Sequence, residues 1–554
     1  MYIWKVKKGL SRERSVDSTR RVTSSTGSCR VPTPPGVIGH ESSPGVSAAT
    51  SVGAGIFLSR LVGFVRDRVF AHYFGSSDFA DAWRAALRLP NVIQNLLGEG
   101  TLSASLIPIY AEYLEKGEEE KAGHLAGAAL GILTVVGGGL ALLGILVAPL
   151  LVEVLFFRWS PDKQAITITL VRILFPMTGM LVISAWALTI LNSHRRFFIS
   201  YVAPVLWNVS MIAAMVGGFV YLDLGERDLV VALGWGALVG GALQLMFQVP
   251  FVLKYRTGLR ISVGRHVEGL KEAIQNFIPV VTARGVINLS GWLDLFLAAL
   301  LVDGAVAVLG YAQTFYMLPI SLFGISVAAS ELPELSRMRV EEEQVLASRV
   351  STALRRVSFF VIPSAAVYLV LGDVVVAAVF QTGAFGSVET LVTWGVLGAY
   401  AIGLPASASS RVLSSAFYAL RDTKTPAKIA YIRIVVSIVI GLSLMIPLDD
   451  LGFEQLRLGA AGLALGASAG AWLEYVLLRR SLRVMIGAHG PGSSAVLRVM
   501  LAATLAVGSG VLLQLTLPAA HPIVLGVATL IPTGLVYVAT AAFLGEKISD
   551  RVRR

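Results

Sequence analysis

Charged residues interrupt an otherwise apolar part of the chain between Ser59 and Tyr113. On insertion scales, a charged side chain at the centre of a membrane helix costs about 2.5–3.5 kcal/mol, so such residues usually face a water-filled cavity on a substrate or ion path. A guanidinium group also binds phosphate through two parallel hydrogen bonds. The arginines therefore predict a cationic cavity for a substrate with a phosphate or pyrophosphate headgroup. The charged residues behind this prediction are Arg60, Arg66, Asp67, Asp81, Arg84, Arg88 and Glu99.

Helical geometry indicates how these side chains are arranged. Arg60 and Arg66 are six residues apart and lie roughly 120° from each other around a helix, so they can line two walls of one cavity. Asp81, Arg84 and Arg88 follow at spacings of three and four, which places them on one stripe and allows Asp81 to pair with the arginines. The alternative is that the arginines extend into the lipid headgroups and that Asp81 forms a purely structural pair with Arg84.

The composition determines which elements must position these charges. Hydrophobic residues make up 55% of the chain, the mean hydropathy is +0.72 and charged residues are 15%, against about 25% in a typical soluble protein. The chain is therefore predicted to be an all-α polytopic membrane protein. Cys29 is the one cysteine, which excludes an intrachain disulfide, and the histidines have no metal-binding spacing, so no metal is expected.

The hydropathy pattern predicts about fourteen membrane-spanning helices after residue 45. Lys and Arg concentrate in alternate loops, which marks the cytoplasmic side and places both termini in the cytoplasm of a multi-pass protein. These loops also explain the net charge of +11 through contact with anionic membrane lipids, so no nucleic-acid partner is needed.

Two interrupted spans indicate an internal repeat. Leu89-Pro90 is followed by a glycine-bearing break and Pro108, and Leu318-Pro319 is followed by Gly324 and Pro333. If the two copies have six helices each, they form two lobes related by a pseudo-twofold axis along the membrane normal, and transporters of this kind bind substrate between the halves. The predicted parts are an N-lobe at 46–258, a C-lobe at 259–486, two C-terminal helices at 487–546 and a cytoplasmic tail at 547–554, preceded at 1–45 by a disordered basic tail or a mis-assigned start.

Several segments resemble the MurJ/MviN lipid II flippases of the multidrug/oligosaccharidyl-lipid/polysaccharide exporter superfamily. They are SRLVGFVRDRVFAHYFG (59–75), DAWRAALRLPN (81–91), GEGTLSASLIPIYAEYL (98–114), NSHRRFFISYVAPVLWNVSMI (192–212) and DTKTPAKIA (422–430). The resemblance covers roughly residues 46–550. It implies fourteen helices and two lobes around a cationic central cavity, in agreement with the helices, repeat and charges predicted above.

The resemblance implies a function and a mechanism. It implies a flippase of the bacterial inner membrane that moves lipid-linked peptidoglycan precursor (lipid II) to the outer leaflet by alternating access. The lipid tail would rest along the last two helices, and the process would serve peptidoglycan synthesis and cell shape beside the cell-wall synthesis machinery. It needs no covalent catalysis and no cofactor, and the coupling ion stays open. Arg60 and Arg66 match arginines thought to engage the pyrophosphate, and Asp81 and Glu99 match acids tied to substrate handling or gating.

The chain departs from the family pattern at two cationic positions. Gln94 stands where the family commonly has an arginine after its LPN motif, and Ala312-Gln313-Thr314 stands where it often has ADR. Arg284 and Asn288 form a second polar stripe on the seventh expected helix, and we expect Arg284 to restore part of the lost charge. The candidate substrate-binding residues are Arg60, Arg66, Asp81, Arg88, Asn91, Glu99, Arg284 and Asn288.

Other functions stay open at this point. The two lost charges fit an exporter of another polyprenyl-linked glycan, a drug-type exporter of the same superfamily, or a non-transporting scaffold. A membrane-embedded glycosyltransferase would need catalytic carboxylates on sizeable extramembrane loops, and the outward loops expected here are short.

Overall fold

The computed structural model describes residues 44–255, 257–264, 267–328, 331, 343–450, 457–517 and 521–546. The chain divides into two units, Met1–Ser47 and Ala48–Arg554, and the second holds the helices apart from the first turn of α1. The expected tails at 1–45 and 547–554 lie outside the described residues, except that α1 begins at Pro44.

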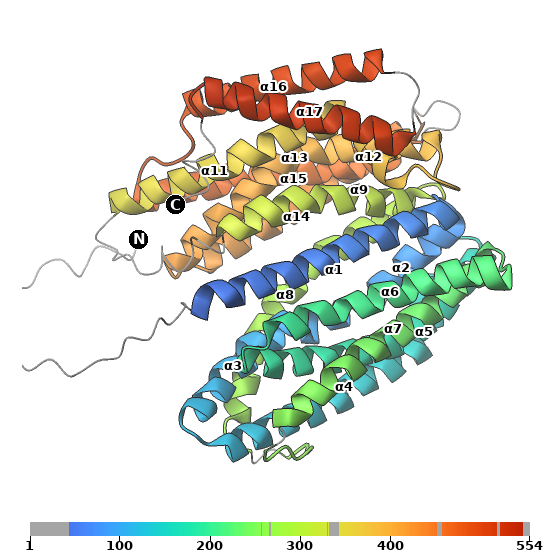
Figure 1. Ribbon diagram of the computed structural model, residues 1–554, viewed down its shortest axis with the longest axis vertical. Helices are drawn as coiled ribbons and strands as arrows, with labels where there is room; N and C mark the ends of the chain where they lie inside the picture. Colours follow the sequence, from blue (N-terminus) through green and yellow to red (C-terminus); the bar gives the residue numbers. More distant parts are fainter. Residues whose placement is uncertain are drawn as a thin grey trace, which may run out of the picture. The chain divides into compact units, whose positions relative to one another are not determined.

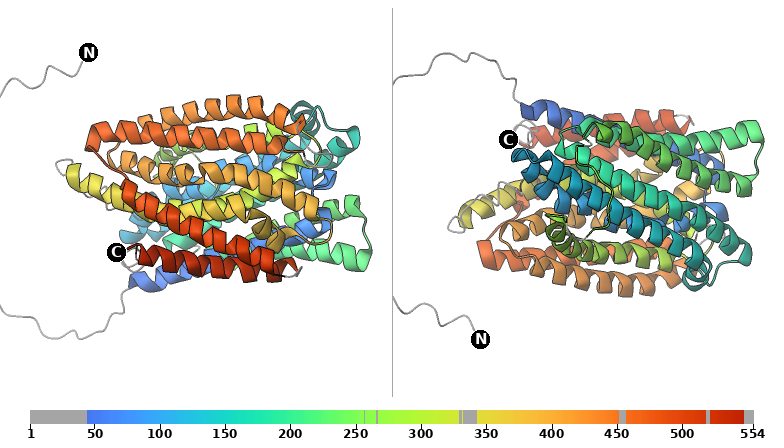
Figure 2. Two further views of the ribbon diagram at one scale, coloured as in Figure 1. Left: turned by 90° about the horizontal axis from the view of Figure 1, so that it is seen from above. Right: turned by 90° about the horizontal axis from the view of Figure 1, so that it is seen from below.

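All named elements of the described residues are helical, as predicted. They are α1 (Pro44–Phe74), α2 (Asp78–Leu97), α3 (Glu99–Glu115), α4 (Glu119–Leu155), α5 (Pro161–Ser193), α6 (Phe197–Leu222), α7 (Glu226–Val252), η1 (Leu253–Tyr255), α8 (Leu270–Ala298), α9 (Ala305–Pro319), η2 (Ile320–Ile325), α11 (Glu343–Val370), α12 (Gly372–Phe380), α13 (Ser387–Ala419), α14 (Lys424–Asp450), α15 (Gly459–Ile486), α16 (Ser493–Thr516) and α17 (Pro522–Phe543). The long helices run roughly along one common direction, from side to side in both views of Figure 2.

Within the described residues, eleven helices are long and apolar enough to cross a membrane. The other three expected spans fall on α1, on α2 together with α3, and on α8, so the count of fourteen stays a prediction. The outer helices expose apolar surface, since only 17% of the apolar window of α14 is buried against 61% for α5 and for α13. Such a surface is stable in lipid but not in water, which makes this a multi-pass membrane protein.

Both predicted interruptions are present. The helix α2 is followed by Gly98, whose backbone is extended. A Cβ there would lie 2.1 Å from the carbonyl oxygen of Gln94, so this break requires glycine. The other break follows Pro319, where α9 gives way to a π-helical turn, η2, that contains Gly324. Turns of this kind occur often at functional sites, because they free backbone carbonyl groups.

The helices pack in two groups. We call α2 to α7 the N-terminal helix group and α9 with α11 to α15 the C-terminal helix group, since the main packing contacts fall within each set. The helices α16 and α17 pack against α11 and α12 at the edge of the second group (Figure 1). The helix α8 contacts α2 and α3 as well as α14 and α15, so it lies between the two groups.

Candidate functional site

A cavity of about 310 Å³ lies between the two helix groups. The helix α2 contributes three polar residues to its wall, Arg84, Arg88 and Asn91, which follow at spacings of four and three and therefore share one face. The opposite walls come from Asp294 of α8 and from Gln313 and Thr314 of α9. Arg84 and Arg88 of the predicted stripe thus face a cavity, whereas Asp81 does not line it. Of the eight expected site residues, Arg88 and Asn91 line this cavity.

Asp294 is a cavity residue that the sequence analysis missed. It lies on α8 within electrostatic range of Arg88 from the N-terminal helix group and Arg433 from the C-terminal helix group. Arg433 is already paired with Glu474, with 2.6 Å between Nη1 and Oε2. Asp294 itself forms no direct ion pair with any residue that the structure describes. A lone carboxylate in an apolar helix was the available signal, because such a charge is costly in a membrane.

The arginines of α1 lie outside this cavity. Arg66 pairs with Asp67 at 2.7 Å, donates a hydrogen bond to Asn208 Oδ1 at 2.9 Å and lies over the ring of Trp207, so it turns toward α6. Arg60 instead donates a hydrogen bond to Ser321 Oγ of η2 at 2.7 Å. The predicted divergence of the two side chains is present, but one contacts η2 and the other contacts α6. Their role in binding substrate stays a prediction.

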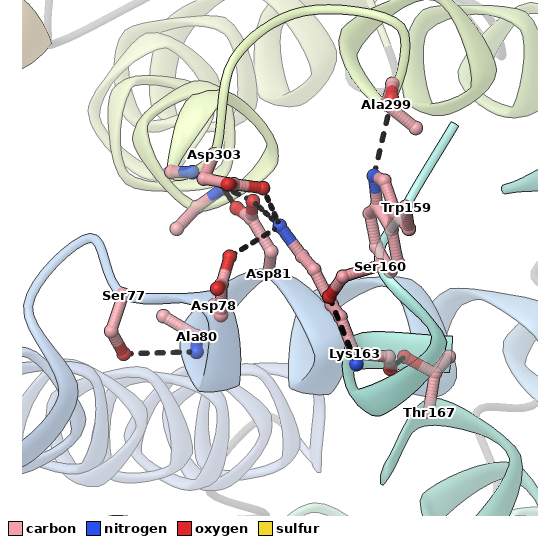
Figure 3. A network of polar contacts seen from close by, with 12 residues as sticks. Ser77, Asp78, Ala80, Asp81, Trp159, Ser160, Lys163, Thr167, Ala299 and Asp303 are labelled. Atoms are coloured by element: carbon pink, nitrogen blue, oxygen red, sulfur yellow. Dashed lines mark hydrogen bonds and ion pairs between the residues drawn. The ribbon is translucent and has the colours of Figure 1, made fainter. Parts of the chain in front are cut away.

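Asp81 belongs to a separate ion cluster rather than to the cavity (Figure 3). The ammonium group of Lys163, at the start of α5, lies 2.8 Å from Asp81, 2.8 Å from Asp78 and 2.7 Å from Asp303. Asp81 also accepts backbone hydrogen bonds from the amides of Gly304 (2.7 Å) and Ala307 (2.8 Å). The expectation that Asp81 pairs with the arginines of its own helix is therefore wrong, because its ion-pair partner is Lys163 of α5.

This cluster joins the two helix groups at one end of the bundle. Asp78 and Asp81 come from α2 and Lys163 from α5, whereas Asp303 lies in the turn between α8 and α9. The carboxylate oxygens lie within 4.8 Å of one another, a spacing that a metal ion would accept, but the ammonium group of Lys163 contacts all three carboxylates. The cluster is thus a set of ion pairs across the interface.

Further contacts join the groups at the same end, which we call the closed end and define by the turns at 75–77, 156–160, 299–304 and 381–386. The indole of Trp159 donates a hydrogen bond to Ala299 O at 3.1 Å (Figure 3), and the hydroxyl of Tyr311 donates one to Gly75 O at 2.8 Å. The amide of Ala384 donates to His72 O at 2.8 Å. The cavity is therefore separated from this end by a layer of polar contacts.

The electrostatics of the closed end favour the charged form of Asp303. Partial burial acts to raise the pKa of Asp303, but the hydrogen bond and the charge of Lys163 outweigh it, so the pKa of Asp303 lies below its ordinary value. Asp303 is therefore ionised, and its attraction for Lys163 is retained, throughout the neutral range.

Three expected site residues cannot be placed at the cavity. The side chains of Glu99, Arg284 and Asn288 lie outside the described residues, although their backbones belong to α3 and α8. The idea that Arg284 restores a lost charge stays a prediction.

The fold defines the class of protein first. The structure is similar to "Lipid II flippase MurJ, inward closed conformation", with a TM-score of 0.73 and 22% identity over 89% of this chain and 98% of that one. It is also similar to an inward-facing multidrug resistance MATE family transporter of the MOP superfamily, with a TM-score of 0.61 and 15% identity over 79% of this chain and 98% of that one. The fold is thus that of the MOP-type membrane transporters.

Sequence comparison identifies the family within that class. The family model for "Lipid II flippase MurJ" matches residues 70–533. The lipid II flippase MurJ of Burkholderia cenocepacia is 32% identical over 449 residues, which cover 79% of this chain and 83% of that protein. The probable lipid II flippase MurJ of Rhizobium meliloti is 29% identical over 446 residues, covering 79% and 80%. The chain belongs to the MurJ family of lipid II flippases.

Proposed function

We propose that this protein flips lipid II, or a closely similar polyprenyl-pyrophosphate-linked glycan, from the cytoplasmic to the outer leaflet of the bacterial inner membrane. The observation that carries the proposal is the cavity between the two helix groups, where Arg84, Arg88 and Asn91 of α2 face α8 and α9. Guanidinium and amide donors suit the oxygens of a pyrophosphate. The family relationship supports peptidoglycan synthesis, and hence cell shape, as the process served.

The proposed mechanism is alternating access without covalent catalysis or a cofactor. The ion cluster around Lys163 closes one end. The alternation of Lys/Arg-rich loops supports an outward position of this end, with both termini in the cytoplasm. Substrate would enter from the opposite end and leave after the closed end separates. Because the sequence has no nucleotide-binding loop, we expect an ion gradient or the membrane potential to drive the cycle.

Rescue of bacteria depleted of their own lipid II flippase tests the function. The parent protein should restore growth, and Arg88→Ala should fail to do so at equal membrane abundance. Arg172→Ala is the matched control, since Arg172 is an exposed arginine of α5 outside the cavity. Lack of rescue by a well-expressed parent would favour the second candidate, another lipid-linked glycan, for which Gln94 and Thr314 at commonly cationic positions are the argument.

The orientation has a separate test. A single cysteine at exposed Ala384 of the closed end, with Cys29 replaced by serine, should react with a membrane-impermeant thiol reagent added to intact spheroplasts. Protection until the membrane is permeabilised would contradict an outward closed end.

A further inference from the structure

Arg84 is a partly buried arginine that forms no ion pair with a carboxylate of the described residues. Two of its three guanidinium nitrogens, Nε and Nη2, are buried and have no hydrogen-bond acceptor among the described residues. Two other partly buried arginines have acidic partners: Arg66 pairs with Asp67, and Arg433 pairs with Glu474. Buried charged donors without acceptors destabilise a structure unless another interaction offsets the cost.

Two aromatic rings supply part of that compensation. The guanidinium carbon of Arg84 lies 5.4 Å from the ring centre of Phe70 and 4.8 Å from that of Tyr311. Phe70 belongs to α1, whereas Tyr311 belongs to α9. A cation over aromatic faces is stabilised electrostatically, but it gains no hydrogen bonds in this way. Nε and Nη2 of Arg84 are thus held in place without an acceptor among the described residues.

The surroundings on α9 make room for this side chain. A Cβ at Gly310 would lie 3.2 Å from Cδ and from Nε of Arg84, so Arg84 packs directly against the α9 backbone. Thr314 lies one turn further along α9 and shares the cavity with Arg84. Its hydroxyl donates back to Gly310 O at 3.0 Å, so it is turned toward its own helix. The positive charge on this side of the cavity therefore comes from α2.

We propose that Arg84 is a pyrophosphate-binding residue of this chain and that it supplies from α2 the cation missing from Thr314 on α9. This inference rests on the proposed function and names a further binding residue of the same site. While the closed end stays closed, the guanidinium group of Arg84 lies against the neighbouring rings of Phe70 on α1 and Tyr311 on α9. When α9 moves away from α1 and α2 as that end opens, the Tyr311 ring withdraws and Nε and Nη2 become available to phosphate oxygens. Arg84 then holds the headgroup at the outer part of the cavity.

The test moves the charge from one helix to the other. Arg84→Met keeps an unbranched apolar stem on the two rings and removes the charge, whereas Arg84→Met/Thr314→Arg restores a cation from α9. Arg172→Met is the control for loss of an arginine outside the cavity. All variants are compared for rescue of flippase-depleted bacteria at matched membrane abundance. Purified proteins are compared for the rise in Tm with farnesyl pyrophosphate, with farnesol as the uncharged probe.

We expect Arg84→Met to lose rescue and to bind farnesyl pyrophosphate about tenfold or more weakly, with the double variant regaining both properties. Rescue by Arg84→Met equal to that of the parent would overturn the inference. So would loss of rescue that Thr314→Arg does not restore, because Arg84 would then act through packing. If the parent itself does not rescue, the proposed function fails instead. The binding measurement then decides alone: a pyrophosphate-specific rise in Tm that depends on Arg84 supports the inference, and its absence overturns it.

Discussion

Replacing Lys163 by methionine should release the closed end. The side chain of Lys163 is 2% exposed and that of Asp81 is 1% exposed, whereas Asp78 and Asp303 are 47% and 72% exposed. Without the ammonium group, Asp78 and Asp303 stay hydrated, but Asp81 becomes a buried carboxylate with only two backbone donors. Removing one partner of a buried ion pair costs about 3–5 kcal/mol, and the two remaining N–H groups place the value near the lower limit.

This loss destabilises the closed conformation relative to the open one, because water can hydrate Asp81 once α2 and the turn at 299–304 separate. A change of about 3 kcal/mol corresponds to roughly a hundredfold shift of the conformational equilibrium. The assay is a distance distribution between spin labels at exposed Arg158 and Ser387, on opposite sides of the closed end, with Cys29 replaced by serine. Lys163→Met should increase the population with long distances.

The control is Lys116→Met, because Lys116 forms an exposed pair with Glu112 at the other end of the helices. Exposed pairs of this kind contribute little, so this variant should keep the parent distribution. The double variant Asp81→Asn/Lys163→Met removes both buried charges and should recover part of the short-distance population. A Lys163→Met protein with the same distances and the same Tm as Lys116→Met would refute the reasoning.

Three further variants test other parts of the structure. Asp294→Asn removes the carboxylate that faces Arg88 in the cavity, so it should tighten farnesyl pyrophosphate binding several-fold and slow transport, with exposed Asp162→Asn as the unchanged control. Gly98→Ala places a Cβ against the α2 backbone and should lower Tm and membrane yield, as measured by thermal unfolding in detergent. Asp422 accepts hydrogen bonds from the hydroxyl of Thr425 and from the Thr425 and Lys424 amides, and these lower its pKa. At pH values above the ordinary carboxyl pKa of about 4, Asp422→Ala should therefore lower the free energy of unfolding by at most about 1 kcal/mol. This difference from the parent should vanish as the pH falls through the lowered pKa of Asp422. An equal difference at low pH would contradict this role.

The broad architecture could be predicted because its causes are local. Apolar length, the glycine and proline breaks and the three-and-four spacing on α2 are properties of short segments. The structure confirms helices in the described part of the chain and both interruptions, and it places Arg84 and Arg88 of the predicted stripe on one wall of the cavity. The same local pattern could not show which part of the structure each side chain of the stripe contacts. Arg84 lies at the cavity, whereas Asp81, one turn earlier on the same helix, lies at the closed end.

The tertiary structure decided which charges meet. Asp81 lies 82 residues from Lys163 and 223 residues from Gly304, and a sequence pattern contains no information on which of several lysines will reach a buried carboxylate. Arg60 and Arg66 were correctly expected to diverge, but their partners, Ser321 and Asn208, depend on how η2 and α6 pack beside α1. Asp294 gained its place opposite Arg88 in the same way. The sequence by itself determined that charges would be held inside a helical membrane bundle, since hydropathy is additive along the chain. Only packing determined their partners, because the free energy of a buried charge depends on the few atoms within hydrogen-bond distance.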